Sequence, residues 1–328
     1  SKGAMLTHGN LGSNAEVLKK FWAWKKGDVL LHALPIFHVH GLFVASHGAL
    51  LNGSKMIWLP RLDTKELIKH MPRSTVMMGV PTFYVRLLLD KEFSKQTVKN
   101  MRLFVSGSAP LLTETFNLFK ERTGHTILER YGMSETVMLV SNPYEGARVG
   151  GSVGVPLPKT QVRITSDDGK LCGVNQIGSV EVKGPNVFKG YWRMPEKTKE
   201  EFTKDGWFKT GDIAIVEDGY YRIMGRNSVD IIKSGGYKIS ALEIEEVLRT
   251  HASIDDCAVV GIADDEWGEL IVAALVIKDA NINLEELNKW LREKMASYKT
   301  PRKYLLVNEL PRNAMGKVTK NDVKKLFA

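Results

Sequence analysis

The stretch that decides the fold is RLFVSGSAPLLTETFNLFKERTG, residues 102–124. Its opening segment, Arg102–Ser106, is mostly apolar and typical of a buried strand that ends at Gly107. The run Thr113–Arg122 then has helical spacing and ends at Gly124, a residue type that commonly closes a helix. A strand followed by a helix is the unit from which parallel α/β sheets are built.

Short apolar runs and amphipathic stretches alternate in the same way before this segment. The apolar runs predict strands at Val29–Leu34, Lys55–Leu59 and Thr75–Met78. Helical spacing predicts helices at Thr64–His70, with Asp63 as its cap, and from Phe83 to Leu89. The first part of the chain is therefore predicted to be an α/β subdomain with a parallel sheet.

The pattern changes at about Val149, where Gly and Pro become dense. Short β segments at Val162–Ile164, Ser179–Val182 and Tyr220–Ile223 predict a small, mostly antiparallel β subdomain. Alternation returns after Arg226, with helices at Ala241–Thr250 and Leu284–Met295 and strands at Cys257–Ile262 and Ile271–Ile277. We therefore expect an α/β subdomain over residues 1–148, a β subdomain over 149–226 and a separate small α+β domain over 227–328.

The composition excludes several classes of protein. Of 328 residues, 43% are hydrophobic and 25% charged, and no stretch approaches the roughly 18 apolar residues of a membrane helix, so a soluble protein is expected. Cys172 and Cys257 have no metal-ligand spacing and suit a reducing compartment without disulfides. The net charge of +9 comes from scattered Lys and Arg without an RNA-binding pattern of aromatics, which favours a solvated surface over a nucleic-acid site.

Four clusters combine Gly, polar and charged residues in a way that packing alone does not require. The first is Arg130–Thr136, in which an acidic residue beside a hydroxyl could hold Mg²⁺ and contact phosphates. The second is Thr210–Asp212, whose carboxylate in a tight turn suits ribose hydroxyls. The third is Gly225–Arg226 with Asp230–Ser240, where glycines permit close approach of the backbone to a ligand. The fourth, Pro311–Lys317, presents a lysine after a glycine.

In this order and at these spacings, the four clusters resemble the signature motifs of the adenylate-forming superfamily, which includes acyl-CoA synthetases. The resemblance extends over the whole chain, and Ser1–Leu6 is similar to the tail of the family's phosphate-binding loop. It implies that residues 1–226 are the C-terminal part of a large AMP-binding domain and that 227–328 are a mobile C-terminal AMP-binding domain. ATP, Mg²⁺ and CoA are the implied cofactors and substrates.

The resemblance also implies a role for each matching residue. Lys317 would bridge the carboxylate and the α-phosphate, Thr136 would contact the phosphate, and Glu135 would be the metal ligand. Cofactor-binding positions are Lys2, Ser108, Ala109, Pro110, Arg130, Tyr131, Gly132, Asp212 and Arg226 for ATP, and Gly235, Gly236 and Lys238 for CoA. Asp230 is the implied hinge about which the C-terminal domain rotates between two half-reactions.

Within the superfamily the chain is most similar to malonyl-CoA synthetases, through Pro35–Phe43, Gly79–Tyr84 and Asn186–Trp192. That resemblance implies that His38 and His40 line the substrate pocket and that Arg86 binds the distal carboxylate of malonate. A carboxylate bound away from water needs a fixed cation, and a guanidinium can bind it with two hydrogen bonds.

The expected function is therefore ATP-dependent ligation of malonate to CoA through an acyl-adenylate. Alternatives are ligation of another small or medium acid such as methylmalonate, acetate or a fatty acid, and a luciferase-like or amino-acid-activating enzyme that does not form the CoA thioester. An alternative from another class is a basic nucleic-acid- or anion-binding protein without catalysis. The partners expected are the acid, ATP and CoA, without nucleic acid or membrane insertion. The missing part of the phosphate loop predicts a chain truncated at its N-terminus and inactive alone, and a cytoplasmic location is expected, with mitochondria or another organelle as alternatives.

Two other sequence patterns are typical of different functions. His38 and His40 could suggest zinc, but no neighbouring Cys, Asp or Glu completes a ligand set. The segment Gly150–Gly154 matches the GxSxG elbow of serine hydrolases, which must lie between a strand and a helix. Pro156 and Pro158 prevent that helix, so a turn entering the β subdomain is predicted instead.

Overall fold

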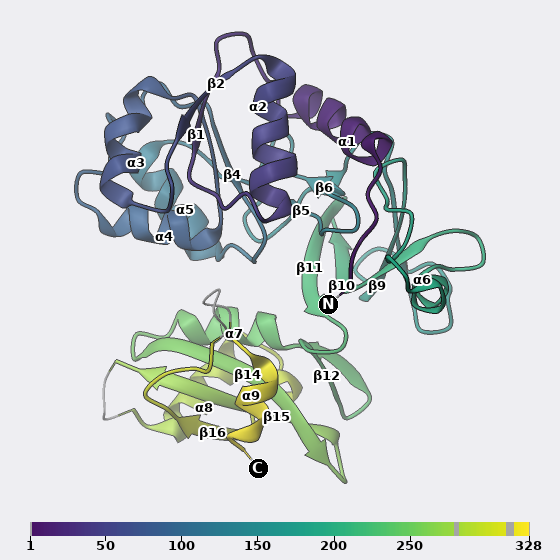
Figure 1. The fold of residues 1–328 in the computed structure, drawn as a ribbon. Coiled ribbons are helices and arrows are strands. Elements are labelled where there is room, and N and C mark those ends of the chain that lie inside the picture. Colours follow the sequence, from purple (N-terminus) through teal and green to yellow (C-terminus); the bar gives the residue numbers. More distant parts are fainter. Residues whose placement is uncertain (1, 279–281, 313–317, 328) are drawn as a thin grey trace. The chain divides into compact units, whose positions relative to one another are not determined.

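The computed structural model describes residues 2–278, 282–312 and 318–327, and the chain divides into two compact units (Figure 1). Unit 1 comprises residues 1–176, 180–210 and 216–222, and unit 2 comprises 177–179, 211–215 and 223–328. The α/β class expected from the sequence is confirmed. The domain boundaries at 148 and 226 stay predictions.

A seven-stranded sheet forms the centre of unit 1. Its order is β2-β1-β3-β4-β5-β6-β7, and the pairs from β2 to β5 are parallel. The strands are β1 (Val29–His32), β2 (Lys55–Trp58), β3 (Val76–Gly79), β4 (Leu103–Ser106), β5 (Leu128–Tyr131), β6 (Val140–Ser141) and β7 (Val155–Pro156). The strand positions expected up to Ser106 are confirmed to within a few residues, because apolar runs bury both faces of a parallel sheet.

Helices pack on both sides of this sheet (Figure 1). They are α1 (His8–Phe21), a π-helical segment (His40–Ser46), α2 (His47–Asn52), α3 (Thr64–His70), α4 (Pro81–Leu89) and α5 (Thr113–Thr123). Figure 1 shows α1 and α2 together on one side and α3, α4 and α5 together on the other. Asp63 caps α3 by accepting a hydrogen bond from the Glu66 N–H, and Gly124 closes α5 in the left-handed conformation, as expected.

The Gly-rich and Pro-rich region forms a second, four-stranded sheet of order β11-β10-β9-β8. Its strands are β8 (Gln161–Thr165), β9 (Gly178–Lys183), β10 (Phe208–Glu217) and β11 (Tyr220–Arg226), and the one helix in this region, α6 (Pro195–Glu201), lies between β9 and β10 in sequence. The turn predicted in Gly150–Gly154 is confirmed at Gly150 and Gly151, and the strand β7, not a helix, follows it.

Unit 2 contains a five-stranded sheet, in which β13-β12-β15-β14 is the main order and β16 pairs with β15. The strands are β12 (Ile231–Ser234), β13 (Tyr237–Ser240), β14 (Ile254–Asp264), β15 (Gly268–Ile277) and β16 (Lys303–Leu306), and the helices are α7 (Ala241–Arg249), α8 (Leu284–Lys294) and α9 (Lys320–Lys325). Side chains of β14 and β15 alternate between two apolar clusters: Val259 and Ala273 pack in the cluster that includes α7 and α8, while Ala258 and Val272 pack in the one that includes α9.

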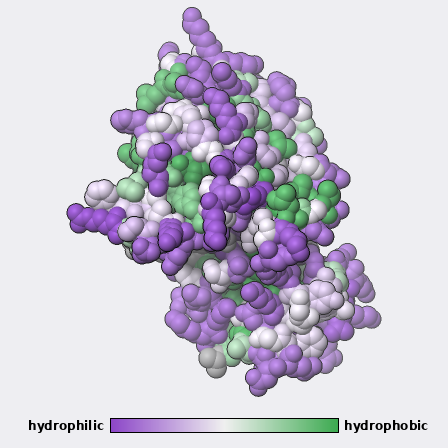
Figure 2. All heavy atoms as spheres, turned by 90° about the vertical axis from the view of Figure 1, so that its right-hand side faces the viewer, coloured by the Kyte–Doolittle hydropathy of each residue, from purple (hydrophilic) through white to green (hydrophobic). Residues whose placement is uncertain are grey.

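The exposed surface is largely hydrophilic on the face shown in Figure 2, with hydrophobic side chains in separate small areas. Among the described residues, no helix has the length and apolar character needed to cross a membrane. Neither Cys172 nor Cys257 forms a disulfide in the described part of the chain, and burial raises the pKa of Cys257 to about 12. That thiol therefore stays protonated and acts as part of the core.

One buried carboxylate joins three strands of unit 1 where they begin. Asp28 precedes β1 and accepts hydrogen bonds from the Lys25 N–H (2.7 Å), the Thr75 hydroxyl (2.8 Å) and Arg102 Nε (2.8 Å). Thr75 and Arg102 directly precede β3 and β4, so these contacts align the amino ends of β1, β3 and β4. Burial alone would raise the pKa of Asp28, but the bonds from Arg102, Lys25 and Thr75 outweigh it and lower that pKa.

We predict that Asp28→Ala lowers the free energy of unfolding by about 3 kcal/mol, because it leaves Arg102 without its buried partner. The folded-state pKa of Asp28 is depressed, so its stabilisation is present above the unfolded pKa and is lost as the pH falls through the folded value. Urea unfolding at neutral pH and below about pH 4 checks both points, since the variant's loss should shrink in acid. Asp168→Ala, which removes an exposed partner of Lys170, is the matched control and should leave the midpoint unchanged. An equal effect of both variants would contradict the role of Asp28.

Candidate functional site

The carboxyl ends of β1, β3, β4 and β5 meet at one edge of the unit 1 sheet, because these strands are parallel neighbours. Each strand is followed within a few residues by one of the predicted site segments. These are residues 35–43 after β1, 80–86 after β3, 107–110 after β4 and 132–136 after β5. This edge is where ligands bind in open α/β sheets.

Arg130, on β5, places a guanidinium in the interior of unit 1. The residue is only 4% exposed, and its Nε and Nη2 atoms are buried without a hydrogen-bond partner. Among the described residues, no carboxylate pairs with it. Burial lowers the pKa of Arg130 to about 9, so the group still carries its charge at neutral pH. An unpaired buried cation is costly, which marks this position as a candidate anion site.

The guanidinium fits at this place because residue 107 has no side chain. A Cβ atom on Gly107 would lie 2.4 Å from the Arg130 Cζ atom. Helix α4 is held against strand β4 next to the guanidinium, because the buried Tyr84 of α4 donates a hydrogen bond of 2.6 Å to the Val105 carbonyl of β4. Three neighbouring elements, α4, β4 and β5, therefore fix the position of the charge.

Two predicted pocket residues interact electrostatically with Arg130. His40 is buried, and its pKa is lowered well below the usual value by burial, then by Arg130, His38 and His32. Burial and Arg130 also lower the pKa of His38, whose Nδ1 accepts a 3.1 Å hydrogen bond from the His40 N–H. Both rings are therefore neutral at neutral pH and can serve as hydrogen-bonding groups beside the guanidinium.

Ser108 connects this group to the segment after β4. Its hydroxyl lies 3.4 Å from His40 Nδ1, and its backbone adopts a left-handed φ of 69°. The following residues, Ala109 and Pro110, are exposed. Four of the predicted site residues thus lie close to one another: His38, His40, Ser108 and Arg130.

A second group forms around Glu135. Its Oε1 atom accepts a 2.8 Å hydrogen bond from the Tyr191 hydroxyl, and the Lys2 ammonium lies 4.6 Å from the centre of the Tyr191 ring. Lys2 also lies 3.8 Å from Glu201. The beginning of the chain is held here by backbone bonds, from the Trp192 N–H to the Gly3 carbonyl (2.7 Å) and from Met5 to Gly190 (2.9 Å). Lys2 and Glu135, far apart in sequence, therefore share one neighbour.

Thr136 lies next to this group and is buried. Its Oγ1 atom has no hydrogen-bond partner, while its carbonyl accepts a 2.8 Å bond from the Asn186 amide. Tyr131 and Gly132 are half-buried in the same segment. A polar hydroxyl left unbonded beside a carboxylate is what a site for a hydrated cation or a phosphate would require.

Arg86, the residue predicted to bind the distal carboxylate, lies in a different environment from the buried Arg130. It lies on α4, as expected, but its side chain is exposed, whereas Tyr84 of the same helix is fully buried. Its role stays a prediction.

In unit 2, the two residues expected at the ribose form an ion pair. Arg226 Nε, at the end of β11, lies 3.0 Å from Asp212 Oδ1 on β10. Asp230 is bonded to the same arginine, because its Oδ2 accepts from the Arg226 N–H (3.0 Å) and its own N–H donates to the Arg226 carbonyl (2.8 Å). Asp212, Arg226 and Asp230 therefore form one connected group.

The remaining predicted residues of unit 2 lie at the hairpin between β12 and β13. Gly235 and Gly236 have φ values of 56° and 82°, which favour glycine, and Lys238 of β13 is half-buried. The Tyr237 and Tyr298 rings stack beside the turn, with centroids 4.6 Å apart. Lys317 lies outside the described residues.

Sequence reasoning missed two residues of the site and one requirement. Tyr191, whose hydroxyl donates to Glu135, lies within the Asn186–Trp192 motif but has no predicted role of its own, and His32, buried beside His40, belongs to no predicted motif. The need for Gly107 depends on the approach of Arg130 from another strand. Zinc at His38 and His40 was set aside, and within the described part of the chain no three His, Cys, Asp or Glu side chains form a metal cluster.

Comparison with known proteins identifies the relatives of this chain. The model of the AMP-binding enzyme family matches residues 1–192, and that of the AMP-binding enzyme C-terminal domain matches residues 243–317. A malonate–CoA ligase of Arabidopsis thaliana is 42% identical over 99% of the chain and 58% of its own length. The mitochondrial malonate–CoA ligase ACSF3 of Mus musculus is 43% identical over 99% of the chain and 62% of its own length.

A solved structure is similar to this chain in fold as well as in sequence. The crystal structure of ATP-bound MatB from Rhodopseudomonas palustris has a TM-score of 0.94 and 47% identity, and it covers 100% of this chain and 65% of that one. The chain thus spans about six tenths of the length of the curated relatives it matches. With one family model matching more than half of its residues, the chain belongs to the family of AMP-binding enzymes.

Proposed function

We propose that the protein carrying this chain is an ATP-dependent ligase that joins malonate to CoA. The observation that supports this most strongly is the buried Arg130 guanidinium, which has two unbonded nitrogens and no carboxylate partner among the described residues. The names of the relatives from Arabidopsis thaliana and Mus musculus support the same acid.

A dicarboxylate matches this environment for an electrostatic reason. One carboxylate of malonate must react with ATP, so the other must be bound elsewhere in a fixed orientation. A buried guanidinium can donate two parallel hydrogen bonds to that second carboxylate, and the low dielectric of the interior strengthens them. An acid with one carboxylate would leave Arg130 unpaired and would therefore bind more weakly.

The neutral state of the neighbouring histidines supports this assignment. If His38 and His40 were protonated, they would repel the Arg130 guanidinium and would themselves attract the anion. Instead, burial and Arg130 lower both pKa values, so Arg130 remains the positive charge among these three side chains. They can accept or donate one hydrogen bond at each ring nitrogen. We infer that Arg130 binds the distal carboxylate, a role that differs from the nucleotide contact expected from its motif. Arg86 of α4, the residue expected to bind this carboxylate, is proposed as a second cation for it.

The residues around Glu135 suit the phosphates of ATP. The carboxylate fixed by Tyr191 and the unbonded Thr136 hydroxyl fit a Mg²⁺ ion held mainly by water and phosphate oxygens, which needs few protein ligands. Bound there, the ion would neutralise phosphate charge. Lys2 adds a cation on the same side. Ser108, Ala109, Pro110, Tyr131 and Gly132 are proposed to flank the nucleotide, and Asp212 with Arg226 to bind its ribose.

The reaction has two steps. A carboxylate oxygen of malonate first attacks the α-phosphorus of ATP, the bond to the β-phosphate breaks, and pyrophosphate leaves. The sulfur of CoA then attacks the acyl carbon, AMP leaves, and the thiol proton passes to solvent. We assign Lys317 to the first step, where its ammonium stabilises charge shared by the carboxylate and the α-phosphate.

Two unlike steps at one centre require different side chains at the same place. We propose that the C-terminal domain turns about Asp230, which removes Lys317 and brings Gly235, Gly236 and Lys238 to the CoA thiol. Asp230 suits a pivot because it lies in the short connection between β11 and β12, and hinges are found at such element ends. We place the reaction in the cytoplasm, whose reducing conditions suit cysteines without disulfides, with mitochondria as the alternative named for the Mus musculus relative.

We predict that Arg130→Leu lowers kcat/KM for malonate by about a hundredfold or more, because a desolvated carboxylate loses its charged partner. Pyrophosphate release with ATP and CoA measures it in the natural protein that carries this sequence. Arg130→Lys should be intermediate, since an ammonium keeps the charge without the two-bond geometry.

The stability of Arg130→Leu separates a substrate role from a structural one. A guanidinium without a buried partner destabilises the fold, so this variant should unfold at an equal or higher denaturant concentration than the parent. Arg73→Ala, on the surface after α3, is the control for loss of an arginine and should keep full activity. Unchanged malonate kinetics in Arg130→Leu would discard the assignment.

A further prediction separates the two half-reactions. Lys317→Ala should abolish malonate-dependent pyrophosphate release yet leave thioester formation from pre-formed acyl-adenylate within about twofold of the parent, because the lysine acts only on the charge of the first transition state. Rapid mixing of acyl-adenylate with CoA measures the second step alone. Equal loss of both steps would refute the assignment of Lys317 and the two arrangements of the C-terminal domain.

A further inference from the structure

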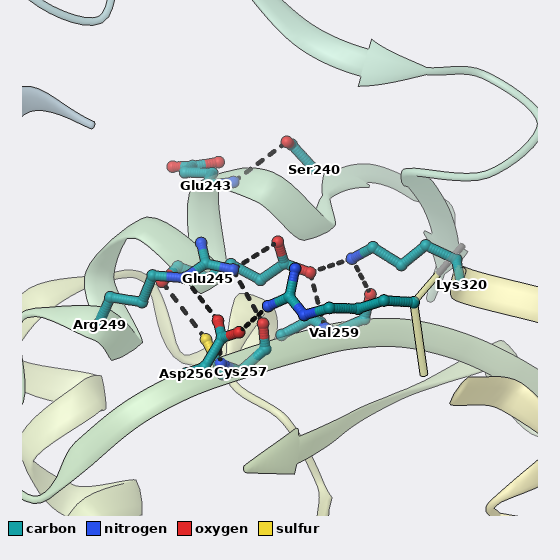
Figure 3. Close-up of polar contacts among 9 residues, drawn as sticks. Ser240, Glu243, Glu245, Arg249, Asp256, Cys257, Val259 and Lys320 are labelled. Atoms are coloured by element: carbon teal, nitrogen blue, oxygen red, sulfur yellow. Dashed lines mark hydrogen bonds and ion pairs between the residues drawn. The ribbon is translucent and has the colours of Figure 1, made fainter. Parts of the chain in front are cut away.

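A chain of alternating charges crosses unit 2 (Figure 3). At its centre, Glu245 of α7 and Lys320 of α9 form a direct ion pair in which both residues are buried. Both side chains also bind the backbone of β14: Glu245 Oε1 accepts from the Val259 N–H (2.8 Å), and Lys320 donates to the Val259 carbonyl (2.8 Å). The pair thus connects α7 and α9 through one residue of β14.

The charges continue from Glu245 toward the start of β14 (Figure 3). Arg249 Nη2 lies 3.5 Å from Glu245 Oε2 and donates to the Cys257 carbonyl (2.9 Å), while its Nε donates to Asp256 Oδ1 (3.2 Å). The other oxygen of Asp256 accepts a hydrogen bond from Arg312. The order is therefore Arg312, Asp256, Arg249, Glu245 and Lys320, with positive charges at both ends.

The two ends of this chain of charges flank a short segment of sequence. Arg312 lies five positions before Lys317, and Lys320 lies three positions after it. The residues on either side of the segment are paired: Arg312 forms an isolated antiparallel bridge with Val318, and the Thr319 N–H donates to the Pro311 carbonyl (2.9 Å). Both ends are therefore held at fixed places on α7 and β14.

Packing alone does not account for this arrangement. A buried ion pair seldom stabilises a fold more than apolar side chains of the same volume would, because both charges must lose their water. Its benefit is geometric, since each charge has one arrangement in which all its hydrogen bonds are made. An apolar contact between α9 and β14 already exists through Val323 and Val260. The charged contacts thus add a fixed register to elements that are already packed.

We propose that Arg312 and Asp256, together with the Glu245–Lys320 pair, are positioning residues that fix both ends of the segment carrying Lys317 for the adenylation step. This inference rests on the proposed function. It assigns these residues no contact with substrate and no part in the thioester step, in which Lys317 has no role.

The test uses Arg312→Ala in the natural protein that carries this sequence. We expect malonate-dependent pyrophosphate release to fall by about tenfold to a hundredfold, because loss of alignment of a catalytic group has costs of this order. Thioester formation from pre-formed acyl-adenylate should stay within about twofold of the parent, since it does not use Lys317. Arg312→Lys, which keeps the charge toward Asp256, should recover most of the lost adenylation rate.

A second variant distinguishes a loss of positioning from a loss of folding. Glu245→Gln combined with Lys320→Met removes both buried charges at once, which avoids leaving one unpaired and should preserve the unfolding midpoint. It should nevertheless slow adenylation selectively. Lys325→Ala, on the same helix as Lys320 but paired only with Asp322 of that helix, is the control and should behave as the parent.

The outcomes distinguish this inference from the proposed function. If the parent releases no pyrophosphate with any acid, the proposed function itself is wrong. If the parent is active and Arg312→Ala slows both half-reactions equally, or neither, the positioning role is refuted. Selective loss of adenylation with recovery in Arg312→Lys is the result that supports it.

Discussion

The interaction on which the site of unit 1 depends is the burial of one positive charge, that of Arg130, without a carboxylate partner within the described residues. Evolution normally pairs such a charge or removes it, because an isolated ion in a protein interior is unfavourable. In unit 1, the residues around Arg130 leave room for its side chain in the interior. The Arg130 side chain of β5 packs against Gly107, directly after β4, and Tyr84 of α4 is hydrogen-bonded to the Val105 carbonyl of β4. The incomplete pairing of this guanidinium is explained if an anionic ligand completes it.

At the opposite edge of the same sheet, a buried charge is paired with a residue of opposite charge. Asp28 and Arg102 are also largely buried, but there the acid and the base satisfy each other and align the beginnings of three strands. One edge thus has an ion pair with its hydrogen bonds made, and the other has a buried cation with two unbonded nitrogens. Local stability is sacrificed at functional sites in this way when the ligand supplies the missing contacts.

Much of the fold could be predicted from the sequence, because its signals are local. The helix Thr64–His70 and its cap Asp63 follow from spacing and from one short side chain, and the end of α5 follows from Gly124. The π-helical segment His40–Ser46 was not predicted, since its apolar pattern resembles any buried run. Arg130 was expected at the nucleotide from its motif alone. Its burial, and the contact of Tyr191 with Glu135, depend on residues distant in sequence that only the folded chain brings together.

The two units contribute different kinds of order to the proposed reaction. Unit 1 has the buried Arg130 guanidinium that we propose as an anion site, and unit 2 has the chain of charges that we propose to position the segment bearing Lys317. Neither arrangement is needed for packing, and both have a cost in desolvation, which is why we assign them to function.

If Arg130 binds the second carboxylate, the protein selects a dicarboxylic acid over acids with one carboxylate. The most direct measurement is ATP- and CoA-dependent pyrophosphate release by the natural protein with malonate, methylmalonate, succinate, acetate and octanoate at equal concentration. We expect malonate to give the highest kcat/KM, with one AMP and one thioester formed for each pyrophosphate. Preference for acetate or octanoate would contradict the role given to Arg130, and no release with any acid would contradict the ligase assignment as a whole.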